Sequence, residues 1–387
     1  MINFISSLSQ HYKITLYFLE DNNSNEYENL FNSNVEFRPY VLKRNIINSI
    51  LKHSFFWLEY YELYHIIKKN SIRKYDLIIC HDLPVLYPAI RLAKYYKTKI
   101  IYDSLEIYNE TINQFFPLVN GIFKKFISFL LIHFMRWNGT LSEKFMTANV
   151  DLMITVNESL ANYFQEKYKI DKVWSVMNCP PLHEQKPTRA VDFKKIYNID
   201  NENKIFIYQG AFNEGRGLQL LIKAFKKAVA LNSKINLIFI GSGVLENSLR
   251  KMVIEERLEE HVKFFGVVPY RELINYSVAG DFGVNLLEAF NLSKKLASPN
   301  KLFEYIQAEI PVLCSYSPEN NRIFEEYKIG EQCQNTIDDI CRAILKLSSA
   351  TEEELFCYSK NLSKAKSIYN WNNQEKILNS LVQSLIG

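Results

Sequence analysis

Short apolar segments alternate with helix-like segments along almost the whole chain, and this alternation limits the possible folds more than any other feature. In the first half, strand-like runs of β-branched and apolar residues begin at Lys13, Val35, Asp76, Lys99, Asp151 and Val173. Helix-like segments separate them, including an amphipathic one over about 45–69. Because parallel strands are joined by long crossover connections, the pattern predicts an α/β fold with helices on both faces of a mostly parallel sheet.

The same alternation resumes in the second half after an interruption. The segment NCPP, from Asn178, opens a polar stretch that extends to about residue 203, as is typical of an interdomain linker. Beyond it, five further strand-like runs read IFIYQG, INLIFIG, VKFFG, FGVNLL and PVLCSY. We therefore predict two Rossmann-like, doubly wound domains, 1–178 and 179–371, that face a central cleft. A C-terminal helix at about 372–387 is expected to pack on the first domain.

Composition and charge exclude several classes of protein. The net charge of +4 is mild and no basic run is interleaved with aromatic residues, so we expect no nucleic-acid partner. The six cysteines are scattered without a Cys-x-x-Cys pair, which argues against a metal site and for reduced, buried thiols. The start of the chain does not resemble a signal peptide, and the most apolar run, 126–135, is about half the length of a membrane-spanning helix. A cytoplasmic location is expected.

The segment SPNKLFEY, from Ser298, has the features of an anion site at the start of a helix. Ser298 is a good N-cap residue and Pro299 fits the first helical turn, where its missing N–H costs nothing. The free N–H groups of such a turn attract anions, and Lys301 adds a positive charge there. Glu304 lies on the same face and could accept hydrogen bonds from ribose hydroxyls. The alternative is a capped amphipathic helix on which Lys301 and Glu304 are only solvated.

Two glycine-containing loops follow strand-like runs in the same domain. One runs from Gly210 to Gly217 and contains Arg216, whose guanidinium can hold phosphate oxygens in a bidentate contact. The other is Gly241-Ser242-Gly243. Either loop alone could be only a tight turn. Together with the SPNKLFEY segment they predict one phosphate site, because all three follow strands of one domain.

With these segments the sequence resembles glycosyltransferase family 4, the retaining family with the GT-B fold of two Rossmann-like domains. The pattern G…RG-x-x-x-L-I-x-A-F matches 210–225, and PNKLFEYIQAEIPV, from Pro299, matches the helix that grips the donor. The resemblance extends into the first half through YDLIICHDLPVL and KIIYDSLEIYNE. The chain is most similar to the branch of the family that carries the PNKLFEY form.

The resemblance implies a role for each matching residue. Arg216 and Lys301 would neutralise the donor diphosphate as catalytic groups, and Glu304 would bind the ribose. The other donor-binding positions would be Gly210, Gly241, Val267, Asn300 and Leu302. No cofactor and no divalent metal would be needed, because basic side chains and a helix end stabilise the leaving group. The absence of an Asp-x-Asp motif agrees with this expectation.

The sequence departs from the family pattern at several places. Leu296 stands where many members have a glutamate that contacts the donor sugar, and Leu105 stands where D-S-H-E motifs have a histidine. The chain also opens at a helix-like segment, so the first strand of the N-terminal domain is expected to be missing. On the acceptor or sugar side, His81, Asp82 and Glu106 are the candidates, with Glu106 the better acid and a structural role for His81 left open.

The segment 115–137 combines aromatic, aliphatic and basic residues and could lie in a membrane interface; the alternative is a buried helix under a loop. The resemblance implies a hydroxyl acceptor on a lipid-linked glycan of a bacterial surface polysaccharide (capsule, O-antigen or exopolysaccharide), and hence work at the inner face of the plasma membrane. Retaining hexosyl transfer from a sugar nucleotide, in class EC 2.4, is the leading hypothesis. A catalytically silent nucleotide-sugar-binding relative and a sugar-nucleotide epimerase are the alternatives.

Overall fold

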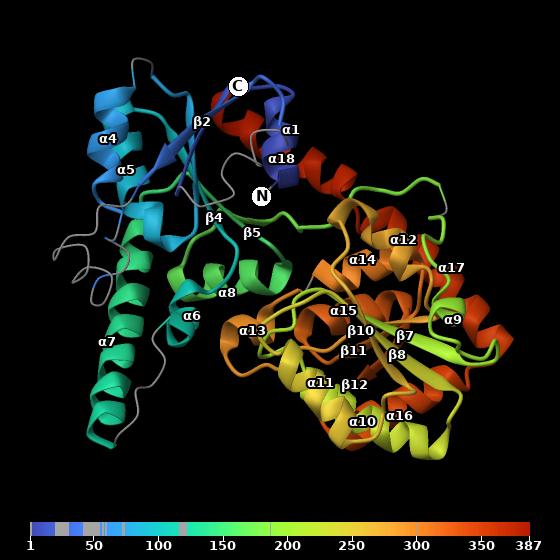
Figure 1. Ribbon diagram of the computed structural model, residues 1–387. Helices are drawn as coiled ribbons and strands as arrows, with labels where there is room; N and C mark the ends of the chain where they lie inside the picture. Colours follow the sequence, from blue (N-terminus) through green and yellow to red (C-terminus); the bar gives the residue numbers. More distant parts are fainter. Residues whose placement is uncertain are drawn as a thin grey trace. The chain divides into compact units, whose positions relative to one another are not determined.

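The computed structural model describes residues 2–19, 31–41, 55, 58, 60–71, 74–115, 122–185, 187–298 and 300–387, with only the backbone for 113–115 and 122–125 (Figure 1). The described chain divides into two compact units. Unit 1 comprises 1–177 together with 374–387, and unit 2 comprises 178–373. The C-terminal segment therefore belongs to the same unit as the N-terminal half.

Unit 2 is built on a parallel sheet of six strands in the order β12-β11-β10-β7-β8-β9. The strands are β7 (Lys204–Gln209), β8 (Ile235–Ile240), β9 (Val262–Gly266), β10 (Phe282–Asn285), β11 (Val312–Ser315) and β12 (Gly330–Cys333). The chain builds outward from β7 in one direction and then from β10 in the other. The strand order therefore reverses between β7 and β10, and in open α/β sheets ligands bind at such a switch point.

The strands of unit 2 form where the sequence is continuously apolar, because both faces of the sheet are covered. Every residue of β8 is buried, as are five of the six residues of β7. The helices of unit 2 are α9 (Phe193–Ile196), α10 (Leu218–Leu231), α11 (Glu246–Glu255), α12 (Leu273–Ser277), α13 (Leu292–Leu296), α14 (Asn300–Ala308), α15 (Pro318–Tyr327), α16 (Ile337–Ser348) and α17 (Glu352–Ile368).

Unit 1 has a four-stranded parallel sheet in the order β3-β4-β5-β6 and a separate parallel pair, β1-β2, among its described residues. The strands are β1 (Ile14–Leu19), β2 (Val35–Tyr40), β3 (Leu77–His81), β4 (Lys99–Ser104), β5 (Leu152–Thr155) and β6 (Val173–Ser175). The helices are α1 (Ile2–Ser9), α4 (Leu63–Asn70), α5 (Leu86–Tyr96), α6 (Tyr108–Phe115), α7 (Ile122–Thr147) and α8 (Glu158–Tyr168). The last helix, α18 (Trp371–Ile386), begins in unit 2 and ends in unit 1.

The strand and helix predictions are confirmed over most of the described chain, since all eleven strand-like runs form strands. The C-terminal tail forms two helices, α17 and α18. Of the helix predicted over 45–69, only the part from Leu63 falls in a described helix, and residues 45–54 lie outside the described residues. No helix of the described residues is long and apolar enough to cross a membrane.

Candidate donor-phosphate site

The candidate site of unit 2 lies where β7 and β10 separate. The two strands pair only at Phe206 with Phe282 and at Ile207 with Gly283, so beyond those pairs the sheet opens toward the carboxyl ends of the strands. The loop after β7 then contacts the loop after β10, because the N–H of Glu288 donates to the carbonyl of Gly215 over 2.9 Å. The glycine-containing loop of 210–217 therefore borders the switch point directly.

Tyr305 fixes α14 in this opening. Its fully buried hydroxyl donates to the carbonyl of Ile207 over 2.9 Å and accepts from the N–H of Gln209 over 3.2 Å. The Tyr305 ring lies on Gly283, where a Cβ would come within 2.5 Å of it. The first turn of α14 is thus held against the ends of both strands, since one side chain satisfies polar backbone groups that the diverging ladder leaves open.

Lys301 is buried in the first turn of α14, with 8% of its surface exposed. Its ammonium donates to the hydroxyl of Tyr208 over 2.9 Å and lies 4.4 Å from the centre of that ring. A Cβ on Gly210 would come within 2.9 Å of the Lys301 side chain, so the glycine provides room for the lysine. Burial, and then the positive charge of Arg216, lower the pKa of Lys301 to about 7. The alternative of a merely solvated lysine is wrong.

Arg216 adds a second positive charge on the same side of the sheet. Its charge lowers the pKa of Lys301 and opposes the rise that burial causes in the pKa of Tyr208. Two cations in a partly desolvated site repel each other, and a bound anion would relieve this repulsion. Arg216 is only partly buried, so its guanidinium remains accessible to solvent.

Glu304 lies one turn beyond Lys301 and is oriented by a chain of hydrogen bonds. The hydroxyl of Ser277 donates to Gln209 Oε1 over 2.5 Å, and Gln209 Nε2 donates to Glu304 Oε2 over 2.7 Å. Burial raises the pKa of Glu304, while the Gln209 bond and the charge of Lys301 act against this rise. The remaining lone pairs of the carboxylate can accept hydrogen bonds from a diol such as ribose.

The loops after β7, β8 and β9 are joined by backbone hydrogen bonds. The N–H of Gly210 donates to Ile240 over 2.8 Å, and the N–H of Gly241 donates to Gly266 over 2.7 Å. The next residue along, Val267, is 72% exposed, so its side chain can meet a ligand. The two loops that the sequence pairs with the SPNKLFEY segment are therefore in contact with each other.

At the start of α14, some residues can reach a ligand with their side chains and others only with their backbone. Asn300 is exposed, whereas Leu302 is fully buried, so only the backbone of Leu302 can face a ligand. The predicted cap is wrong: α14 begins at Asn300, and the buried Ser298 hydroxyl has no hydrogen-bond partner. Pro299 lies outside the described residues.

The candidates of unit 1 meet at the carboxyl ends of β3 and β4. His81 and Asp103 are partners in the strand register, and His81 Nδ1 lies 2.8 Å from Asp103 Oδ2. Asp82 follows with φ of +64°, a conformation that side chains rarely adopt, and accepts from the N–H of Leu105 over 3.2 Å. Burial raises the pKa of Asp82 to about 6, with the charges of Asp103 and Glu106 adding to the rise. Asp82 and Glu106 are thus close enough to influence each other.

Four residues near these sites escaped sequence reasoning. Gln209, Ser277 and Tyr305 position α14 and Glu304, and Asp103 binds His81. Asp103 alone had a usable signal, because it stands at the end of a strand in the same way as His81. Among the described residues, no group of three or more His, Cys, Asp or Glu side chains could hold a metal ion. Five of the six cysteines are buried and Cys357 is exposed.

The second half of the chain matches a known protein family. Residues 191–361, nearly all of unit 2, match the family described as Glycosyl transferases group 1. Residues 191–361 therefore form a domain of this family. The protein is a glycosyltransferase of class EC 2.4 that uses a nucleotide-sugar donor, and the family resemblance noted in the sequence is confirmed for this domain. The branch within the family stays a prediction. No match was found among curated proteins.

Solved structures show that the fold of this glycosyltransferase is GT-B. HepE of Anabaena, in complex with UDP and glucose, matches with a TM-score of 0.70 and 12% identity over 99% of this chain and 95% of its own. Sucrose-phosphate synthase of Thermosynechococcus elongatus matches with a TM-score of 0.70 and 15% identity over 99% and 91%. A glycosyltransferase of Rickettsia africae matches with a TM-score of 0.69 and 12% identity over 99% and 94%. The predicted fold class is confirmed, with two parallel-sheet Rossmann-like domains.

Proposed function

We propose that this enzyme transfers a sugar, with retention of configuration, from a nucleoside diphosphate donor held by unit 2 to a hydroxyl acceptor. Arg216 and Lys301 would bind the diphosphate, and Glu304 the ribose. Backbone groups of Gly210, Gly241 and the first turn of α14 would complete the donor site. The observation that carries the proposal is the burial of Lys301 beside a second cation at the switch point of the sheet.

The chemistry follows from where negative charge develops. As the bond between the anomeric carbon and the diphosphate breaks, charge accumulates on the leaving phosphate oxygens. Lys301, Arg216 and the N–H groups at the start of α14 would stabilise that charge, and Lys301 would need little reorganisation because Tyr208 already holds it. The acceptor hydroxyl would attack from the face of the leaving group, and a phosphate oxygen would take its proton. No divalent metal enters this scheme, so metal independence remains a prediction.

On the side of unit 1, we propose that the acceptor or the transferred sugar meets the carboxyl ends of β3 and β4. His81, Asp82 and Glu106 would contact it there, with Asp103 holding His81. The expected acceptor is a lipid-linked glycan of a bacterial surface polysaccharide, and the expected location is the cytoplasmic face of the plasma membrane. A structural neighbour supports this setting, because one match with a TM-score of 0.58 is a lipopolysaccharide outer core galactosyltransferase.

A catalytically silent relative is the second candidate. Leu105, 37% exposed at the end of β4, puts an apolar side chain where the family motif has a histidine. Such a protein would bind the sugar nucleotide normally. It would neither transfer the sugar nor hydrolyse the donor, so an assay of nucleotide release separates the two candidates.

The proposal is tested by thermal shift with UDP-, GDP-, dTDP- and CMP-sugars in the presence of a chelator. We expect one nucleotide class to stabilise the protein, by about 2.7 kcal/mol at a ligand concentration of about a hundred times Kd. HepE was solved with UDP, which makes UDP-sugars the first choice. Stabilisation that is lost on Lys301→Met supports the assigned site. Equal stabilisation of wild type and variant, or binding that needs added metal, would contradict it.

Binding of the sugar nucleotide is expected to weaken as pH rises through about 7. The lowered pKa of Lys301 means that its ammonium is charged below that pH and largely neutral above it, while the diphosphate stays anionic. Between about pH 6 and pH 8 the Kd should rise about tenfold, as the charged fraction of the lysine falls. Isothermal titration calorimetry in buffers of different ionisation enthalpy measures both Kd and the proton taken up. A profile equally steep in Lys301→Met would assign the effect to another group.

A further inference from the structure

Helix α7 of unit 1 exposes large apolar side chains along most of its described length. The most exposed are Phe126, Phe129, Leu130, Trp137 and Phe145, each between 51% and 67% exposed. Soluble monomers rarely expose an apolar surface of this extent without a partner. The alternative of a buried helix is therefore wrong for this face, and the exposed residues continue eight positions beyond the predicted segment 115–137.

The exposed residues form a stripe opposite the face that packs on the unit. We define the α7 stripe as Phe126, Leu130, Phe134, Trp137, Leu141 and Phe145, which follow one another at intervals of three and four residues. Ile132, Met135 and Met146 occupy the buried side. The stripe is about 29 Å long, at about 1.5 Å per residue. In Figure 1 the N-terminal end of α7 projects away from β4 and β5.

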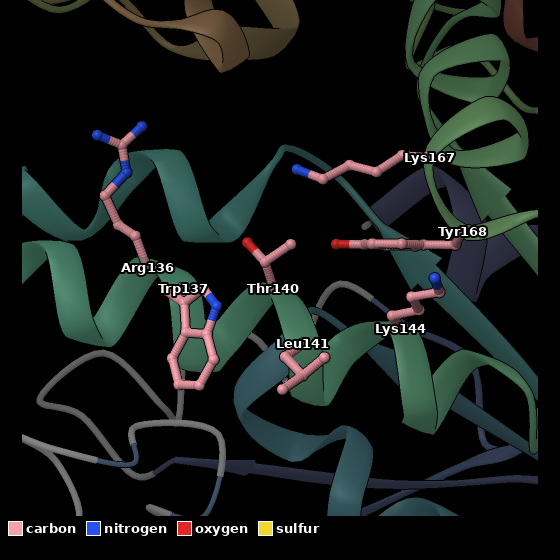
Figure 2. Close-up of a pocket in the computed structure, with 7 residues that line it drawn as sticks. All are labelled: Arg136, Trp137, Thr140, Leu141, Lys144, Lys167 and Tyr168. Carbon is pink, nitrogen blue, oxygen red and sulfur yellow. The ribbon is translucent and has the colours of Figure 1, made fainter.

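A basic pocket borders the C-terminal half of the stripe. It is an open hollow of about 380 Å³ between α7 and the end of α8, and Arg136, Lys144 and Lys167 line it (Figure 2). Trp137 and Leu141 belong to both the pocket and the stripe. Its size is within the roughly 300–1,000 Å³ of typical ligand pockets.

The pocket carries an excess of positive charge. Arg136 pairs with Glu110, but no ion pair of the described residues engages Lys144 or Lys167. Burial lowers the pKa of Lys167, the charges of Glu143 and Glu110 oppose this, and repulsion by Arg136 adds to it. An anion placed among the three cations would relieve this repulsion.

The floor of the pocket is rigid. The hydroxyl of Tyr168 donates a hydrogen bond to Glu143 over 2.6 Å. The same buried carboxyl group accepts hydrogen bonds from Tyr102 and Asn109, each over 2.7 Å. Glu143 is fully buried and satisfied by these three donors. It holds the α7–α8 corner in place, and its charge also raises the pKa of the neighbouring Lys167.

We propose that α7 docks on an anionic lipid bilayer, with the α7 stripe in the interface and the basic pocket around the phosphate of one lipid headgroup. The inference deepens the membrane location proposed above and is independent of the donor site. Aromatic residues on an amphipathic helix with basic neighbours favour the interface of an anionic membrane. A second copy of the chain is a poorer occupant, because pairing two stripes around a twofold axis would bring two sets of the same three cations together.

Vesicle sedimentation tests the proposal on the full chain. We expect binding to phosphatidylglycerol/phosphatidylcholine vesicles and at least about tenfold weaker binding to phosphatidylcholine alone. The pair Lys144→Ala/Lys167→Ala should lower binding to the anionic vesicles about tenfold or more, because each cation near the surface contributes about fivefold. The pair Trp137→Ser/Phe145→Ser should weaken binding to both vesicle types.

Matched control variants test whether vesicle binding depends on the pocket or only on the positive charge of the protein as a whole. Lys94→Ala/Lys172→Ala removes two exposed lysines from the same unit, and Phe356→Ser removes a side chain that is 72% exposed in unit 2. Both should bind vesicles like wild type. An equal loss in the Lys94/Lys172 pair overturns the pocket, and equal binding to both vesicle compositions does the same. A dimer that Trp137→Ser/Phe145→Ser dissociates, without vesicle binding, would make the stripe a subunit interface. Sugar-nucleotide binding should be unchanged in every variant, so failure here leaves the donor site standing.

Discussion

Replacing Lys301 or Arg216 by alanine is expected to lower turnover by about ten- to a thousandfold, the usual range for removing one charge contact to a leaving group. Lys301 is held by the Tyr208 hydroxyl beside the start of α14, and the charge of Arg216 reaches it there. The loss should fall mainly on kcat, because negative charge on the diphosphate is greatest in the transition state. Steady-state assays of nucleotide release measure it once the donor is known.

The stability of the variants distinguishes this role from a structural one. Lys301→Met removes a buried cation whose desolvation disfavours the charged form, so it should leave the unfolding free energy unchanged or raise it while activity falls. Lys223→Ala, which removes an exposed lysine on the helix after the Arg216 loop, is the matched charge control and should keep full activity. Unchanged turnover in both Lys301→Ala and Arg216→Ala would refute the assigned roles.

Gly241→Ala is expected to destabilise unit 2 by about 2–6 kcal/mol, from backbone strain and steric overlap together. Gly241 has φ of +135°, and a Cβ there would lie 2.1 Å from the carbonyl oxygen of Gly210. Relief of this overlap would push Gly210 toward the Lys301 side chain. There is little room for such a shift, because a Cβ built on Gly210 would already lie 2.9 Å from Lys301. Sugar-nucleotide binding should therefore fall together with stability. Chemical denaturation and calorimetry measure the two effects.

Two neighbouring glycines separate the causes. Gly266 has φ of +102° but nothing within 4 Å of a Cβ, so Gly266→Ala carries strain alone, about 1–3 kcal/mol. At Gly243 a Cβ would meet the backbone of Phe212 at 2.6 Å, so Gly243→Ala carries overlap alone. If Gly241→Ala costs no more than Gly266→Ala, the contact between the two loops is not tight and their coupling to Lys301 is wrong.

The fold could be predicted in large part because its signals are local. In a parallel sheet covered on both faces, each strand must be apolar on both sides, and this shows directly in runs such as INLIFI. Strand existence, fold class and the likeness to a family therefore followed from short windows of sequence. The cap of α14 was mispredicted, because Ser298 is a good cap by residue type, while its hydroxyl in the structure has no hydrogen-bond partner.

The candidate site was predictable only as a set of separate segments. Arg216 and Lys301 stood out because cations beside glycines and helix starts have a known use with phosphate. Sequence reasoning could not choose between a solvated and a buried Lys301, since burial depends on Tyr208, which is 93 residues away along the chain. Asp103 was likewise missed, because its bond to His81 exists only through the register of β3 with β4.

The amino-acid sequence by itself determined which segments are strands and helices, since apolar periodicity and glycine placement act over a few residues. It also determined the order of the candidate phosphate-binding segments along the chain. Only the tertiary structure decided that β7 and β10 separate where α14 begins, that Tyr305 bridges them, and that Gln209 orients Glu304. The physical reason is that these contacts join residues about a hundred positions apart, and the strand order that brings them together leaves no mark in any short stretch of sequence.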